Sequence, residues 1–242
     1  MNLMKEENNS KTTCKLNLGS YAYTIKYQPA SLLKLESVIF SRLGGSGVKE
    51  PVLAGNINNV QIKLGFMFIA RDFLKDTIKG KQIPTNYHLS NFIFNTKALL
   101  DAVAVTLNDF YHLGFVKGQI DLSKDIFINK LQTSSSNLAK HISKKRNWID
   151  RVIYWRDEII HRKSVFIGYI SPASANGNPI DLTVKMPMEP VTLFGKLSEM
   201  KRLKDKYGKS DQDIIQFCEN WIDEGKKLIE ITYEQIWNDC EK

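Results

Sequence analysis

Apolar residues recur every three to four positions along most of this chain, which is the spacing of amphipathic helices. The pattern predicts a helix that is capped by Asn58 or Asn59 and continues to about Leu74. A longer and more apolar helix is expected from about His88–Ser90 to Leu113, with Gly114 as its stop. Further helices are expected at 31–40, 121–131, 138–142, 147–162 and 214–237. We therefore expect a mainly α-helical bundle, with the most apolar helix at its centre and packed against the helix of 147–162.

Two parts of the chain alternate between apolar and polar residues instead, which is typical of strands. Short strand-like segments are expected at 15–18 and 21–27. The runs 164–170 and 180–186 flank a turn with Asn176-Gly177, so a β-hairpin is predicted at about 164–187. Residues 1–13 are polar without periodicity and are expected to be a disordered tail. The remaining residues, 14–242, are expected to form a single domain into which the hairpin is inserted.

Composition narrows the classes of function. The net charge is +8 and the pI is about 9.2, which suits either a polyanionic partner or simple solubility. The three cysteines, Cys14, Cys218 and Cys240, lack the spacing of a disulfide framework or a zinc site. The N-terminus resembles no signal peptide, and no apolar run approaches the roughly 20 residues that span a bilayer. We expect a cytoplasmic protein that does not contact a membrane.

The helix of 147–162 carries the residues that are best suited to catalysis or to binding an anion. At 100° per residue, Arg156 lies within an apolar stripe, where an arginine requires an anionic partner or a polar interface. His161 follows Asp157 by four residues, so the carboxylate can orient the imidazole and raise its pKa. The apolar stripe is expected to contain Ile149, Val152, Ile153, Ile159 and Ile160.

This arrangement resembles the HEPN superfamily, whose signature is an arginine, usually a polar residue, and a histidine after four to six intervening positions. Here these are Arg156, Asp157 and His161, and the resemblance covers about residues 88–163 and the C-terminal helix. It implies a HEPN-like helical bundle and a metal-independent, cofactor-free endoribonuclease, commonly a toxin or defence effector. It also implies a homodimer with both signatures at the shared interface, and it leaves room for a neutralising protein partner.

RNA cleavage by its own 2′-hydroxyl requires a proton donor or acceptor and a cation for the developing phosphorane charge. The resemblance assigns the first role to His161 and the second to Arg156, whose planar fork suits two phosphate oxygens. On an ideal helix these two residues point about 140° apart. They can cooperate only if the helix ends or distorts before His161, or if two subunits contribute one residue each.

Other charged residues could support such a site. Asp101 lies in an apolar run, where it is either an acid held near Arg156 and His161 or a structural acid that caps a kink or meets a buried Arg or Lys. The basic triplet Lys144, Lys145 and Arg146 directly precedes the helix of 147–162. It is a candidate for binding the phosphates of single-stranded RNA, although a run of charges is usually a solvated surface.

Rival chemistries have little support in the sequence. The other histidines, His88, His112 and His141, are scattered, and neither a zinc-binding HExxH motif nor a GxSxG nucleophile elbow occurs. A different class of function stays open, namely a non-catalytic HEPN-like helical module that binds a protein or nucleotide partner. The Arg156 to His161 signature favours the nuclease, whereas the lack of a second catalytic motif favours the binding module.

Overall fold

The computed structural model describes residues 14–18, 21–25, 49–77, 82–161 and 214–240, and these are mainly helical. The helices are α2 (Lys49–Thr77), α3 (Gln82–Phe110), α4 (Asp125–Ser134), α5 (Ser136–Lys144), α6 (Arg146–His161) and α8 (Ile214–Cys240). Two short strands, β1 (Cys14–Leu18) and β2 (Tyr21–Ile25), pair in antiparallel fashion. A mainly α fold is thus confirmed for this part of the chain. The hairpin predicted at 164–187 and the tail predicted at 1–13 lie outside the described residues.

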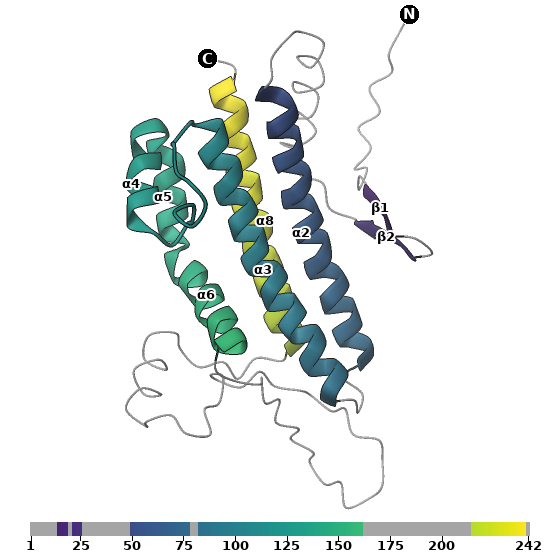
Figure 1. Ribbon diagram of the computed structural model, residues 1–242. Helices are drawn as coiled ribbons and strands as arrows, with labels where there is room; N and C mark the ends of the chain where they lie inside the picture. Colours follow the sequence, from purple (N-terminus) through teal and green to yellow (C-terminus); the bar gives the residue numbers. More distant parts are fainter. Residues whose placement is uncertain (1–13, 19–20, 26–48, 78–81, 162–213, 241–242) are drawn as a thin grey trace, which may run out of the picture.

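Helix α3 is the centre of the bundle, because it contacts α2, α6 and α8. Figure 1 shows α2, α3 and α8 as three long helices lying side by side, with α4, α5 and α6 on one flank. Helices α2 and α3 run in opposite directions, and α6 also runs opposite to α3. The expected central position of α3 and its packing against α6 are both confirmed. Within the described residues, no helix combines the length and apolarity needed to cross a bilayer.

Helices α2 and α3 both begin earlier than the apolar pattern predicts. Helix α2 starts at Lys49 rather than at Asn58 or Asn59, and α3 starts at Gln82 rather than at His88–Ser90. A proline is the third residue of each helix, Pro51 in α2 and Pro84 in α3. Proline lacks an N–H, but the N–H groups of a first helical turn have no acceptor within the helix. A proline in the first turn is therefore compatible with the helix, so each helix can begin before its proline rather than after it.

Helix α3 ends at Phe110, a few residues before the predicted stop at Leu113 and Gly114. The chain turns sharply here, since His112 has a φ of 51° and Gly114 a φ of 77°. The side chain of Asn108 stabilises this turn by accepting a hydrogen bond from the backbone N–H of Phe115 at 3.0 Å. The backbone carbonyl of Asn108 also accepts from the N–H of Leu113, which ends the helical pattern.

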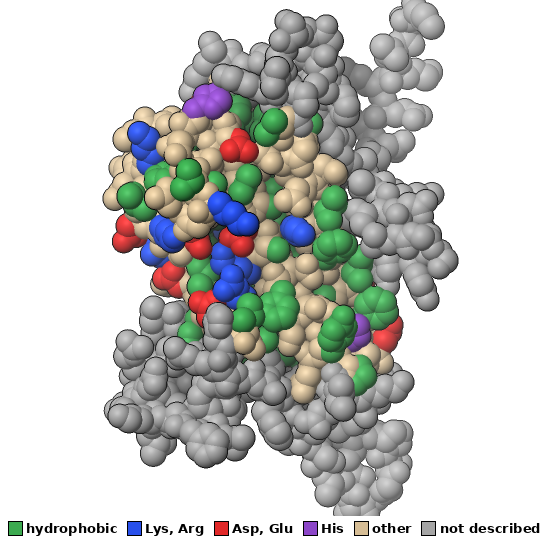
Figure 2. Space-filling view, viewed as in Figure 1, with side chains coloured by type: hydrophobic (Ala, Val, Ile, Leu, Met, Phe, Trp, Pro, Cys, Tyr) green, Lys and Arg blue, Asp and Glu red, His purple; other side chains and the backbone are tan. Residues whose placement is uncertain are grey.

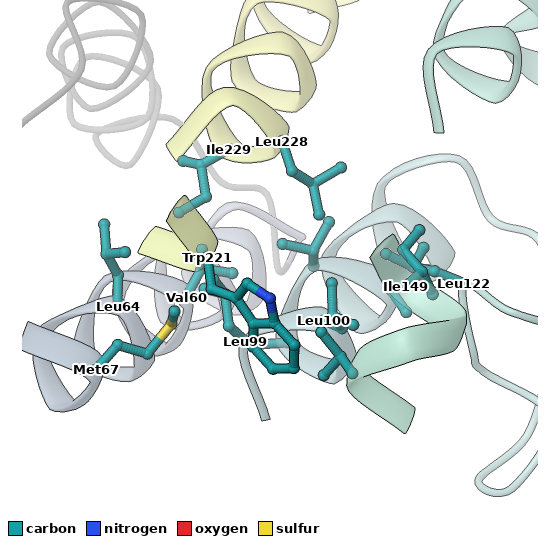
Figure 3. Packing of buried hydrophobic residues seen from close by; sticks show 14 of the residues in the cluster. Val60, Leu64, Met67, Leu99, Leu100, Leu122, Ile149, Trp221, Leu228 and Ile229 are labelled. Atoms are coloured by element: carbon teal, nitrogen blue, oxygen red, sulfur yellow. The ribbon is translucent and has the colours of Figure 1, made fainter. Parts of the chain in front are cut away.

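The core is made of apolar side chains from all six helices, and the segment between α3 and α4 adds Leu113 and Leu122. Figure 3 shows part of it, with residues of α2 on one side of Leu99 and Leu100 of α3, Ile149 and Leu122 on the other, and Leu228 and Ile229 of α8 above them. An aromatic cluster joins three of the helices. The ring centroids of Phe217 and Trp221 lie 4.3 Å apart in α8, and Phe217 also lies 6.2 Å from Trp155 of α6 and 6.3 Å from Phe92 of α3. This cluster fixes α6 against α3 and α8.

Candidate functional site

The buried face of α6 differs in part from the predicted apolar stripe. Ile149, Val152 and Trp155 are fully buried, while Ile160 is 51% exposed. Trp155 was not part of the predicted stripe, yet its large ring packs into the aromatic cluster and sets which face of α6 turns inward. As a result, Ile160 near the end of the helix faces outward.

Arg156 and Asp157 form an ion pair. The Nη1 atom of Arg156 donates a hydrogen bond to Oδ1 of Asp157 at 2.6 Å, and the arginine side chain is 33% exposed. The anionic partner that the sequence requires for Arg156 is therefore its own neighbour. Asp157 had been expected to orient His161; the contact described for its carboxylate is with Arg156.

His161 is the last residue of α6, and the helical backbone continues through it. Its side chain lies outside the described residues. Since it follows Arg156 by five positions along the helix, the two Cα–Cβ directions diverge by about 140°. One way to bring the two side chains together within a subunit was a helix that ends before His161, and α6 does not end there. A site that uses both residues then requires two subunits that contribute one residue each.

Asp101 contacts a lysine of its own helix. The Nζ atom of Lys97 forms ion pairs with Asp101 and, at 3.3 Å, with Asp121. The Lys97 side chain is only 8% exposed, so two carboxylates compensate one buried ammonium group. This arrangement matches the structural interpretation of Asp101, as an acid that meets a buried lysine.

Asp121 begins a turn rather than a helix, because its carboxylate accepts hydrogen bonds from both the backbone N–H and the hydroxyl of Ser123 at 2.8 Å. Helix α4 starts only at Asp125. Burial alone would raise the pKa of Asp121, but the Ser123 N–H and the charge of Lys97 outweigh it and hold this pKa below its usual value. Asp121 therefore favours the folded state in its ionised form.

The basic triplet is largely neutralised by acids of the same chain. Lys145 binds Glu224 of α8 at 2.6 Å, and Arg146 binds Asp125 and Asp150 at 2.9 Å each. Lys144, at the end of α5, is exposed. Figure 2 shows the same mixture of signs, with Lys, Arg, Asp and Glu interspersed on the α4 to α6 flank. Of the triplet, Lys144 is the residue best placed to bind an external phosphate.

Arg151 is a residue that the sequence interpretation missed. Its Nε atom is buried and has no hydrogen-bond partner among the described residues. Its guanidinium lies 5.9 Å from the centroid of the Phe217 ring, and burial lowers its pKa. A signal was available, because the spacing of Trp148, Arg151 and Trp155 places the arginine on an aromatic side of the helix.

The described histidines do not converge on a second site. His88 stacks on Phe73 with ring centroids 4.9 Å apart, and burial lowers its pKa, so the neutral form is favoured. His112 lies in the turn after α3, and His141 is exposed on α5. Among the described residues, no three His, Cys, Asp or Glu side chains are grouped so that they could hold a metal ion.

Comparison with known proteins found no matching family model, no matching curated protein and no matching solved structure.

Proposed function

We propose that this protein is a metal-independent endoribonuclease of HEPN type that cleaves single-stranded RNA by attack of the 2′-hydroxyl. The observation that supports this most is the position of the Arg156 to His161 signature at the C-terminal end of α6, packed beside the long α3 of a helical bundle. The proposal includes a cytoplasmic homodimer and a role as a toxin or defence effector.

In this proposal His161 transfers the proton and Arg156 binds the phosphate on which negative charge develops. The divergence of these side chains along α6 favours a site in which Arg156 of one subunit faces His161 of the other. A two-fold axis near the end of α6 would bring both signatures together and create two such sites. Asp157, already bonded to Arg156, would fix the guanidinium in that site.

Single-stranded RNA is the proposed substrate because in-line attack requires a backbone that can leave A-form geometry. Lys144 would bind phosphates without reading sequence, while Lys145 and Arg146 contribute less because Glu224, Asp125 and Asp150 already bind them. Asp101 would act only indirectly, through Lys97 and the packing of α3.

The test is an RNA-cleavage assay in the presence of EDTA, with wild type beside His161→Ala. We expect wild type to cleave an unstructured RNA pool and His161→Ala to be inactive, because no other group would transfer the proton. Far-UV circular dichroism of both chains controls for folding. An absence of cleavage by folded wild type would refute the proposal.

A second candidate function is a non-catalytic module that binds a protein or nucleotide partner. The observation that favours it is the Arg156–Asp157 ion pair, which already occupies part of the guanidinium that catalysis needs. In that case wild type would bind its partner but leave RNA intact, and His161→Ala would behave like wild type.

A further inference from the structure

Arg151 differs from the other arginines that the structure describes. Arg71 binds Asp72 and Glu219, Arg146 binds Asp125 and Asp150, and Arg156 binds Asp157. For Arg151, neither an ion pair nor a hydrogen bond is found within the described parts of the chain, and its Nε atom is buried without a partner. Burying the Nε donor without an acceptor costs free energy, while the side chain as a whole is only partly buried, so its outer N–H groups can still meet an anion. Such a group calls for an anion from outside the described fold.

The position of Arg151 is fixed by its surroundings. Phe217 lies 5.9 Å from the guanidinium carbon and is only 1% exposed, held by Trp155 and Trp221. An aromatic face attracts a cation but leaves the N–H donors at the edge of the guanidinium plane unused. Phe217 therefore holds the cation in place without satisfying its hydrogen bonds.

A second unsatisfied donor lies one turn away on the same helix. The indole Nε1 of Trp148 is buried and has no hydrogen-bond partner in the described structure. Residues three apart in a helix lie on the same face, so Trp148 and Arg151 are neighbours along α6. Most buried N–H groups in proteins are paired, so two unpaired donors on adjacent turns make this face of α6 a candidate for binding an acceptor group.

We propose that Arg151 and Trp148 form a binding site for a phosphate group, and that its occupant is a phosphodiester of the RNA substrate. The forked guanidinium and the indole N–H together offer several donors to an oxyanion, and the guanidinium fork matches the oxygens of a phosphate group. The net charge of +8 also favours a polyanion. This inference rests on the proposed function, because it names a contact to the same RNA.

The site is separate from the proposed catalytic pair. Arg151 precedes Arg156 by five residues, which is about 7.5 Å along the axis of α6 and about 140° around it. An RNA strand that contacts both arginines must therefore pass around the helix rather than along one face of it. Arg151 would hold RNA at a phosphate other than the one that is cleaved.

The experiment measures binding separately from cleavage. Binding of an unstructured RNA oligonucleotide is followed by fluorescence anisotropy on the full chain carrying His161→Ala, which is expected not to cleave. In this background we compare Arg151→Met, which keeps the apolar contact with Phe217, and Trp148→Phe, which keeps the ring and removes the N–H. Arg71→Met is the matched control, because it removes an arginine that already has two carboxylate partners.

We expect Arg151→Met to weaken RNA binding by about tenfold or more, the loss typical of a hydrogen bond to a charged group. Trp148→Phe should weaken it by a smaller factor, and Arg71→Met should leave it unchanged. RNA affinity of Arg151→Met within twofold of its parent would overturn the proposal, even if wild type cleaves RNA. If wild type does not cleave RNA but RNA binding depends on Arg151, the result would count against the proposed catalysis alone.

Two further measurements separate the alternatives. Inorganic phosphate and a nucleoside monophosphate compete with RNA if Arg151 recognises phosphate itself; binding of either one without any binding of RNA would overturn the assignment to RNA. Thermal unfolding in phosphate-free buffer should show Arg151→Met to be at least as stable as its parent, since a buried Nε donor without an acceptor is removed. A clear drop in its melting temperature would show that Arg151 has a structural partner and would also overturn the proposal.

Discussion

Arg156 and Asp157 are adjacent in the sequence and bonded to each other in the structure, with Nη1 and Oδ1 2.6 Å apart. The ion pair joins two of the three residues assigned to catalysis. It gives Asp157 a role in holding the arginine that the sequence alone had not suggested. The consequence is that changes at Asp157 should act through Arg156.

We expect Asp157→Asn to reduce RNA cleavage by about 10- to 100-fold, the usual effect of losing a group that orients a catalytic residue. An asparagine keeps the size of the side chain and an acceptor oxygen but loses the charge. Initial cleavage rates of the purified variants test this. A rate for Asp157→Asn above that of wild type would show that the ion pair restrains Arg156 from acting.

Lys144 and Lys145 should respond differently to substitution, although they are adjacent. Lys144→Gln should weaken RNA binding and reduce the slope of log affinity against log salt concentration by about 0.7, because one phosphate contact is lost. Lys145→Gln should leave the slope unchanged and lower the unfolding free energy by about 1 kcal/mol, because its bond to Glu224 is lost. Salt titrations and urea unfolding of both variants measure the two effects, and equal slopes for both would contradict this assignment.

Asp121 should make stability depend on pH in the acidic range. Its pKa in the folded protein lies below the ordinary value of 3.8, so its contribution is complete above pH 3.8 and is lost as the pH falls through the folded-state pKa. We expect Asp121→Asn to lower the unfolding free energy by about 1–3 kcal/mol at pH 7 and by progressively less as the pH falls below 3.8. Urea unfolding at several pH values measures the difference.

The matched control for Asp121 is Asp125→Asn, because the Asp125 side chain is 85% exposed. Its effect should stay within about 0.5 kcal/mol at every pH. A destabilisation by Asp121→Asn that is the same at pH 7 and at pH 3 would show that the charge of Asp121 is not the cause.

Gly225 of α8 packs directly against Leu99 of α3. A Cβ atom at position 225 would lie 3.0 Å from a Leu99 methyl carbon, and Leu99 is fully buried. Gly225→Ala should therefore destabilise the wild type, although alanine favours helix by about 1 kcal/mol. In a Leu99→Ala background, which itself costs about 2–5 kcal/mol, the same change should be stabilising. Urea unfolding of the four chains gives the coupling, and an equal effect in both backgrounds would refute the contact.

The helices could largely be predicted from the sequence, because apolar periodicity records which faces are buried. Their first turns could not, since Pro51 and Pro84 are compatible with a helix start that the pattern alone does not show. Separate helices were expected at 121–131 and 138–142, and Ser135 lies between the corresponding helices α4 and α5.

The candidate site was only partly predictable. The sequence identifies Arg156 as an arginine on an apolar helix that needs an anion, but the structure gives it Asp157 and leaves Arg151 without a carboxylate among the described residues. The difference depends on Phe217, which comes 66 residues later in the chain and packs beside Arg151. Local periodicity cannot show which residues of a distant helix will lie opposite.

The two-subunit arrangement can be tested by mixing inactive chains. An Arg156→Ala chain and a His161→Ala chain should each be inactive alone. After unfolding and refolding together, about half of the dimers are mixed and each has one intact site, so about a quarter of the wild-type activity should return. A mixture that stays inactive, beside active refolded wild type, would place both residues of each site in the same subunit.

The chemical identity of the new RNA ends formed in EDTA distinguishes attack by the 2′-hydroxyl from metal-dependent hydrolysis. Attack by the 2′-hydroxyl leaves a 2′,3′-cyclic phosphate on one fragment and a 5′-hydroxyl on the other, without any metal ion. We expect wild type to produce these ends and His161→Ala to produce none. Uncut RNA with folded wild type, or fragments that carry 3′-hydroxyl and 5′-phosphate ends, would contradict the account.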